Sequence, residues 1–269
     1  WWNELSEKWM HDIGIPFYIQ ARPAMLAGKK GIERIETISK RGLVSGISMA
    51  IESGDQSVRK LLLDRHENNN IVLDAIKNVK NFGVPLRTQA IVGLPVIKPS
   101  IPFDSKECKV SLVDHEGKEH YYEDPIQESL KCLDLVCSSF FRREDYYWNA
   151  IYSPFPGTPL GDYSIKAGFA SGDTASQAYL FSSESGLNCF SDLISKRQLA
   201  FSLTSNFFAH FKNGKDLMCL FLYGKNNFDL DGFSSFVSDQ KGNLLPNDQI
   251  STCGLIPNIS NKCLVNFFD

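Results

Sequence analysis

Two charged side chains follow strand-like and helix-like segments, where they could bind a polar ligand. Glu52 ends the apolar run 43–51, and Arg65 would end the helix that follows it. A carboxylate can accept hydrogen bonds from an ammonium group or a ribose diol, and a guanidinium matches a carboxylate at two points. The alternatives are helix capping or a salt bridge with Arg59 or Lys60 for Glu52, and a surface position near a helix C-terminus for Arg65.

A second turn that could approach a ligand contains Val92, Gly93 and Leu94. Glycine lets the backbone come close to a planar group, although a simple strand-to-loop turn has the same composition. Ser53 and Gly54 would shape the corresponding turn after the other strand. These five residues are therefore candidates for the walls of a binding site.

Polar side chains at two further strand ends could face a substrate or a second cofactor. Gln20 and Arg22 end one segment, and Tyr152 and Ser153 end another. The turn at 154–159 contains three prolines, each of which fixes φ, so its first role is structural and its second is to line a substrate site.

The elements that must position these residues alternate along the chain. Asp55 is a plausible N-cap for the helix that follows it. The order β-α-β-α-β-loop-α-β-α predicts a parallel sheet with right-handed crossovers. The expected strands are 17–21, 43–51, 85–92 and 147–152, and the expected helices are 4–10, 31–40, 55–63, 70–82, 126–141, a short one ending near 167, and 191–211.

Composition excludes several classes of function. The 269 residues are 43% hydrophobic and 22% charged, with a net charge of -3, which predicts neither a nucleic-acid surface nor a membrane-surface patch. No apolar run reaches the roughly 18 residues of a membrane span. The seven cysteines show no CxxC spacing, so we expect free thiols in a reducing cytoplasm. His115 and His120 lie in a polar segment that reads as a solvated loop rather than as a metal site.

The sequence pattern predicts two regions, with a boundary at about residue 170. Residues 1–170 contain four strands, too few for a closed eight-strand barrel of about 250 residues, so a partial TIM-like barrel is expected. Residues 98–124 form a polar insertion on the side of the active site. Residues 171–269 form an extension, helical at first and then irregular, and the part after residue 214 has no assignable architecture.

Five motifs in order resemble the C-terminal part of a radical S-adenosylmethionine (SAM) barrel, of the class often preceded by a cobalamin-binding domain. They are Ile-Pro-Phe at 15–17 with Arg-Pro at 22–23, Ile-Glu-Ser-Gly at 51–54, Val-Arg-Lys to Leu-Asp-Arg across 58–65, Val-Gly-Leu-Pro at 92–95, and Pro-Phe-Pro-Gly-Thr-Pro-Leu at 154–160. The resemblance covers roughly residues 5–168.

The resemblance implies a partial (β/α)6 barrel, whose last four strands this chain would supply. It implies SAM bound at a [4Fe-4S] cluster, formation of a 5'-deoxyadenosyl radical, and methylation, rearrangement or ring formation on a small-molecule substrate. Cobalamin and an electron donor such as a flavodoxin or ferredoxin would take part. Glu52 would contact SAM, Arg65 would pair with its carboxylate, and the turn at Gly93 would pack against its adenine.

The chain departs from that family in the cluster ligands, because no Cys-x3-Cys-x2-Cys motif is present. It also has Val96, Ile97 and Lys98 where an acidic residue usually follows Gly-Leu-Pro. We therefore expect a fragment of a longer enzyme that is inactive alone; a trimmed chain would look the same. Two rivals are a different parallel-barrel enzyme, aldolase-like or phosphate-binding, and a degenerate or truncated binding module without catalysis.

Overall fold

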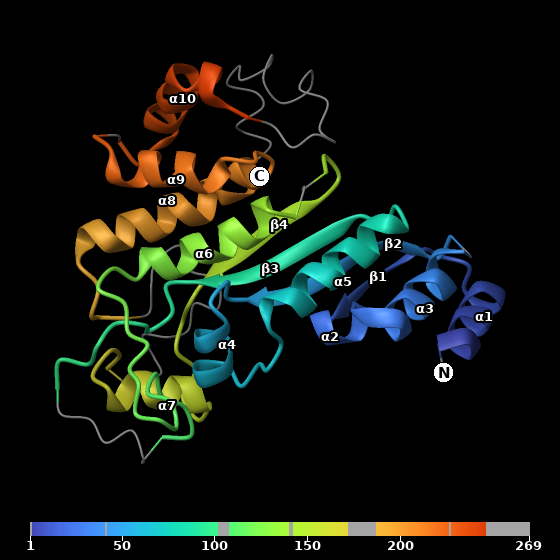
Figure 1. The fold of residues 1–269 in the computed structure, drawn as a ribbon, viewed down its shortest axis with the longest axis horizontal. Coiled ribbons are helices and arrows are strands. Elements are labelled where there is room, and N and C mark those ends of the chain that lie inside the picture. The colour runs from blue at the N-terminus through green and yellow to red at the C-terminus, as the bar shows by residue number, and fades with distance from the viewer. Residues whose placement is uncertain are drawn as a thin grey trace.

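One parallel sheet organises the computed structural model, which describes residues 2–40, 42–101, 108–139, 142–171, 187–225 and 227–245. Its four strands lie side by side in chain order, β1-β2-β3-β4, and each neighbouring pair is parallel. The strands are β1 (Phe17–Ala21), β2 (Val44–Glu52), β3 (Leu86–Val92) and β4 (Tyr146–Ile151) (Figure 1).

Helices follow each strand, as the alternating sequence predicts. The described helices are α1 (Trp2–Asp12), α2 (Pro23–Leu26), α3 (Gly28–Ser39), α4 (Gln56–Leu62), α5 (Asn69–Asn81), α6 (Ile126–Cys137), α7 (Pro159–Lys166), α8 (Asp192–Ala209), α9 (Gly214–Tyr223), α10 (Leu230–Asp239) and the 3-10 helix η2 (Lys241–Asn243). The four expected strands and seven expected helices are confirmed to within a few residues, and α2, α9 and α10 were not anticipated.

The two faces of the sheet differ in what covers them. On β3 the side chains alternate strictly between buried and half-buried, with Leu86, Thr88 and Ala90 on the buried face. Helices α5 and α6 pack against β3 on that side, and α8 packs against β4. Figure 1 shows α5 and α6 lying along the same side of the strands. A right-handed crossover after each strand places successive helices on one side when the strands follow chain order.

The fold-class prediction is confirmed as an α/β protein with an all-parallel sheet of four strands. Closure into a barrel is not seen among the described residues, so the barrel stays a prediction.

Two hydrophobic clusters hold the elements together. The larger lies between the sheet and its helices and continues into α8, α9 and α10. The smaller lies beyond the carboxyl ends of the strands and joins α4, α7 and the 98–124 insertion, from which Val110 and Leu112 are buried. The insertion has no helix or long strand among its described residues, and a turn closes it where the Asp114 amide donates to the Lys118 carbonyl.

The C-terminal helices form an aromatic core. Phe207, Phe208 and Phe221 make edge-to-face or tilted contacts with Phe233 or Phe236 at centroid distances of 5.3–6.2 Å. Such contacts add to the stabilisation from buried area. Because α8 also packs on β4 and α6, this extension is continuous with the core of the sheet.

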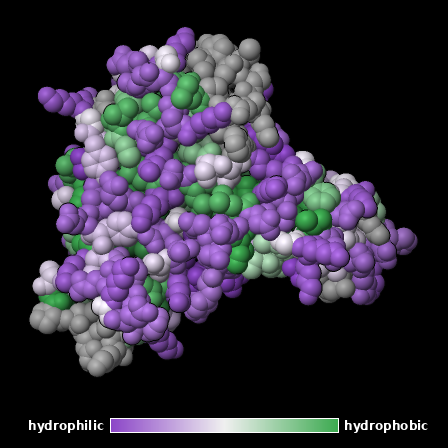
Figure 2. Space-filling view, in the orientation of Figure 1, coloured by the Kyte–Doolittle hydropathy of each residue, from purple (hydrophilic) through white to green (hydrophobic). Residues whose placement is uncertain are grey.

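The surface seen in Figure 2 is mostly hydrophilic, with apolar residues in small groups. None of the described helices has both the length and the apolar character needed to cross a membrane.

Candidate functional site

The candidate site lies at the edge of the sheet that is formed by the C-terminal ends of the four parallel strands. Arg22 follows β1, Glu52 ends β2, Gly93 follows β3 and Tyr152 follows β4. Because parallel strands all end at the same edge, the fold brings these residues to one side of the molecule.

Glu52 has an unusual backbone conformation. Its φ of 67° lies in the left-handed region, and the pairing of β2 with β3 shifts between Ala50 and Glu52. Residues other than glycine and asparagine are disfavoured in this left-handed conformation, so contacts with the surrounding structure must stabilise it at Glu52. Such residues concentrate at functional sites.

Arg65 pairs with Glu52 across the turn. Its Nη2 lies 3.4 Å from Glu52 Oε1, and the two side chains are 32% and 20% exposed. Burial raises the pKa of Glu52, and the charge of Arg65 offsets part of that rise. Arg65 lies beyond α4 rather than at its end, because the helix finishes at Leu62 and Asp64 adopts a positive φ. The pair is therefore partly exposed to solvent, and the loop after α4 determines the position of Arg65.

A fully buried arginine orders this loop. Arg59 donates to the carbonyl oxygens of Ser53 and Glu67 and, at 2.5 Å, to Asn69 Oδ1. These contacts tie α4 to the turn after β2 and to the start of α5. Burial lowers the pKa of Arg59, and the surrounding carboxylates and Cys132 offset part of that shift. The salt bridge from Glu52 to Arg59, considered as an alternative from the sequence, is not seen; the partner is Arg65.

Arg22 contacts a carboxylate from the same loop. Its Nε and Nη2 donate to the two carboxylate oxygens of Glu67 at 3.0 and 3.1 Å. Burial would raise the pKa of Glu67, but the hydrogen bonds and charge of Arg22, a backbone hydrogen bond and the charge of Arg65 together outweigh it, and the pKa is lowered. Arg22 thus has a structural partner, and a role toward substrate stays a prediction.

Asp55 begins α4, as predicted, and has additional partners that the sequence did not reveal. Its carboxylate accepts from the amides of Ser57 and Val58 at 2.7 and 3.2 Å, and Lys131 Nζ lies 2.7 Å away. Tyr122 also donates its hydroxyl hydrogen to Asp55. Burial would raise the pKa of Asp55, but the hydrogen bonds from Lys131, Tyr122 and the Val58 amide and the charge of Lys131 together outweigh it and lower the pKa to about 2.

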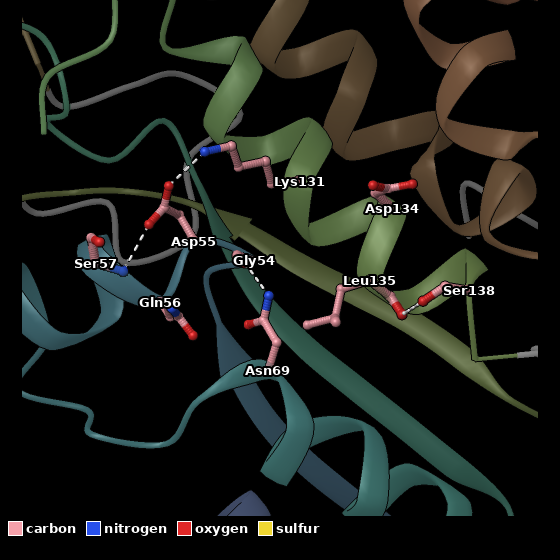
Figure 3. Close-up of a pocket in the computed structure, with 9 residues that line it drawn as sticks. All are labelled: Gly54, Asp55, Gln56, Ser57, Asn69, Lys131, Asp134, Leu135 and Ser138. Atoms are coloured by element: carbon pink, nitrogen blue, oxygen red, sulfur yellow. Dashed lines mark hydrogen bonds and ion pairs between the residues drawn. The ribbon is translucent and has the colours of Figure 1, made fainter.

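A polar cavity of about 560 Å³ opens beside Asp55, between the first turns of α4 and α5 and one side of α6 (Figure 3). Lys131 reaches across it to Asp55, and Asn69 bonds the Gly54 carbonyl at 3.3 Å. The backbone of α6 lies against Gly54, since a Cβ there would be 2.2 Å from the Cys132 nitrogen. Glycine is therefore required at this position by helix packing.

The remaining residues proposed to line a cofactor site have buried side chains. Ser53, Val92 and Leu94 are at most 1% exposed, so Val92 and Leu94 could meet a ligand mainly through their backbone. Gly93 has a φ of 75°, and a Cβ there would lie 2.9 Å from the Gln198 side-chain nitrogen. The lack of a side chain at Gly93 therefore lets the Gln198 side chain of α8 pack closely against this turn.

The proposed substrate residues lie at different depths. Gln20 is exposed and donates to Gln89 Oε1 at 3.0 Å. Tyr152 is buried, with its hydroxyl 3.1 Å from Ser164 Oγ, whereas Ser153 is half-buried. These two groups come from opposite edges of the sheet, β1 and β4. Their role in binding stays a prediction.

No group of three or more His, Cys, Asp or Glu side chains within the described ranges could hold a metal ion. His120 contacts Asp114 at 3.0 Å in the turn of the insertion, and His115 is exposed. None of the cysteines at 108, 132, 137, 189 and 219 forms a disulfide, and Cys253 and Cys263 fall outside the described residues.

Comparison with protein-family models and with curated proteins finds no match for this chain. The family resemblance therefore rests on the sequence motifs alone. The geometry itself offers a partly exposed pair of opposite charges, Glu52 and Arg65, at the carboxyl edge of a parallel sheet. Such a pair can bind a ligand that carries both an ammonium and a carboxylate group.

Proposed function

We propose that this chain is part of the barrel of a radical SAM enzyme and that Glu52 and Arg65 bind the amino acid group of SAM. The motif order supports this proposal, as does the all-parallel sheet in chain order. The reaction would be methylation, rearrangement or ring formation on a small molecule, with electrons from a flavodoxin or ferredoxin and with cobalamin as a possible second cofactor of the class.

The observation that carries the proposal is the backbone of Glu52. The residue keeps a charged side chain at a φ of 67°, next to Arg65 and at the edge where parallel α/β folds bind ligands. A purely structural turn would favour glycine or asparagine there. The ammonium of a bound amino acid would meet Glu52, and its carboxylate would meet Arg65.

The iron-sulfur cluster does not fit any set of described side chains, and we assign it no ligand in this chain. When bound in that family, SAM supplies a 5'-deoxyadenosyl radical. The role proposed for this chain is to bind SAM. Arg59 fixes the loop between α4 and α5, which contains Arg65, and Glu52 lies opposite Arg65 at the end of β2.

Calorimetric titration of SAM into the chain tests the proposal. Glu52→Gln and Arg65→Gln should each weaken binding by about 1–3 kcal/mol, the contribution of a hydrogen bond to a charged group. Lys98→Gln is the matched control, because Lys98 forms an exposed pair with Glu119 at 2.8 Å in the insertion. Absence of SAM binding, or equal affinity in all four proteins, contradicts the assignment.

A truncated ligand locates the contact on SAM. 5'-Methylthioadenosine lacks the ammonium and carboxylate groups, so the two variants should bind it as the wild-type chain does. If both variants lose affinity for 5'-methylthioadenosine as well, Glu52 and Arg65 act on the fold of the site and not on the amino acid group.

A further inference from the structure

Within the part of the chain that the structure describes, the second face of the sheet carries polar and aromatic side chains. Three contacts define this face: Tyr18 lies over Gly46, Gln20 bonds Gln89, and the Arg87 guanidinium lies over the Trp148 ring. The neighbouring residues on β4, Tyr147 and Asn149, point the other way and contact α8. We call the face that bears Arg87 and Trp148 the polar face.

Arg87 is a half-buried cation without an acidic partner in the described part of the chain. The centre of its guanidinium lies 4.8 Å from the centroid of the Trp148 ring, and its Nε is buried without a hydrogen bond. Withdrawing a charge from water is costly unless an opposite charge or hydrogen bonds replace the water. The other arginines described on the sheet edge, Arg22 and Arg65, each have a carboxylate partner.

The neighbours of Arg87 add a hydrogen-bond donor and an apolar surface. Gln89 uses its Oε1 to accept from Gln20, which leaves its Nε2 able to donate to a ligand. The register pairs Gln89 with Trp148, and Ile91 with Ala150 one step further along the same face. An indole ring followed by two apolar side chains suits a flat apolar group.

We infer that the polar face binds a small organic anion that joins a carboxylate to a flat apolar group. Arg87 and Gln89 would bind the carboxylate, and Trp148 with Ile91 and Ala150 would contact the apolar part. The Arg87 end of the site is distinct from the Glu52–Arg65 pair, because Arg87 pairs in register with Ser48, four residues or roughly 13 Å before Glu52 along the strand. The apolar end adjoins that pair, since Ile91 follows Ala90, which pairs with Glu52. The site uses neither Glu52 nor Arg65, so this inference stands without the SAM proposal.

Benzoate is the probe for this site, since it has the carboxylate and the flat ring and nothing else. Binding to the full chain is followed by the shift of the Trp148 indole N–H signal in two-dimensional NMR, assigned with Trp148→Phe. Benzamide, neutral and of the same shape, is the ligand control. Arg87→Gln is the test variant, and Arg143→Gln is its matched control, an exposed arginine just before β4.

Benzoate should move the Trp148 signal in a saturable way and bind at least tenfold more tightly than benzamide. Arg87→Gln should remove that preference, whereas Arg143→Gln should keep it. Equal binding of benzoate and benzamide to the wild-type chain overturns the inference, and this comparison holds even if Arg87→Gln fails to fold. A Trp148 signal that neither compound moves overturns it too.

Discussion

Ser53 donates its hydroxyl hydrogen to the carboxyl group of Glu128, across the contact between the end of β2 and α6. Both side chains are fully buried, and Glu128 Oε2 has no hydrogen-bond partner among the described residues. Burial raises the pKa of Glu128 to about 8; the bond from Ser53 opposes that rise and the charge of Asp55 adds to it. Glu128 is therefore protonated in the folded chain at neutral pH.

This protonation makes stability depend on pH. The unfolded chain releases the proton of Glu128 near its ordinary pKa of 4.5, whereas the folded chain keeps it to about 8. The free energy of unfolding should therefore fall as pH rises from about 4.5 to 8. Glu128→Gln, which mimics the protonated form, should be more stable than the wild-type chain at pH 8 by about 1–3 kcal/mol.

Urea unfolding at pH 5 and at pH 8 measures this effect. Glu33→Gln, an exposed change on α3, is the control and should follow the wild-type chain at both values. If Glu128→Gln loses as much stability between pH 5 and 8 as the wild-type chain does, Glu128 is ionised in the folded state and the expectation fails.

Asp55 should act in the opposite direction. Its pKa is lowered to about 2 in the folded chain, so its contribution is present above its ordinary pKa of 3.8 and is lost as pH falls toward 2. Asp55→Asn should cost about 2 kcal/mol at pH 7, through loss of the charge-assisted bonds to Lys131 and Tyr122, because asparagine can still cap the helix. The variant should also lose less stability than the wild-type chain between pH 4 and 2.

Thermal unfolding from pH 7 to 2 follows the change. Asp134→Asn alters a carboxylate beside the same cavity that is 58% exposed, so it should change stability by less than about 0.5 kcal/mol. A similar loss in both variants would mean that the network of Tyr122 and Lys131 contributes nothing special.

Gly54 should not tolerate any side chain. An added Cβ would meet the backbone of α6 at 2.2–2.3 Å, which a rotamer change cannot relieve. Gly54→Ala should therefore destabilise the chain by about 1–3 kcal/mol or more. Gly242→Ala, with no atom within 4 Å, is the control and should be nearly neutral. A melting temperature unchanged in Gly54→Ala would mean that α6 can move away from the turn.

Local patterns were enough to predict the strands, seven helices and the N-cap at Asp55. An aspartate between an apolar run and an amphipathic stretch has few other roles, and the partners in that cap lie two and three residues away. The strand ends follow from the same logic, because a buried parallel strand is a continuous apolar run that stops at a polar or glycine-rich turn.

Partners far apart in sequence could not be read in this way. Glu128 meets Ser53, and Tyr122 meets Asp55, over separations of 75 and 67 residues. Arg59 reads as a basic residue on a helix surface, yet the loop returns over it and buries it. Helix α10 was missed because serine and glycine interrupt its apolar residues, and packing against the aromatic core overrides that weak propensity.

The backbone of Glu52 gives the last prediction, a test of strain that is independent of ligand binding. Glu52→Gly and Glu52→Gln both remove the carboxylate and the pair with Arg65, so their difference in stability isolates the cost of a side chain at a φ of 67°. Glycine adopts that conformation freely, and relief of the strain should exceed its larger entropy in the unfolded chain. Glu52→Gly should therefore be the more stable variant by about 1 kcal/mol.

Urea unfolding of the two variants side by side measures that difference, and Ser45→Gly at an exposed position of β2 measures the cost of glycine where there is no strain to relieve. If Glu52→Gln equals or exceeds Glu52→Gly in stability, the left-handed conformation carries no strain and the backbone of Glu52 no longer argues for function. If Glu52→Gly is more stable than Glu52→Gln but binds SAM less tightly than the wild-type chain, then Glu52 lowers stability through its backbone conformation and contributes its charge to ligand binding.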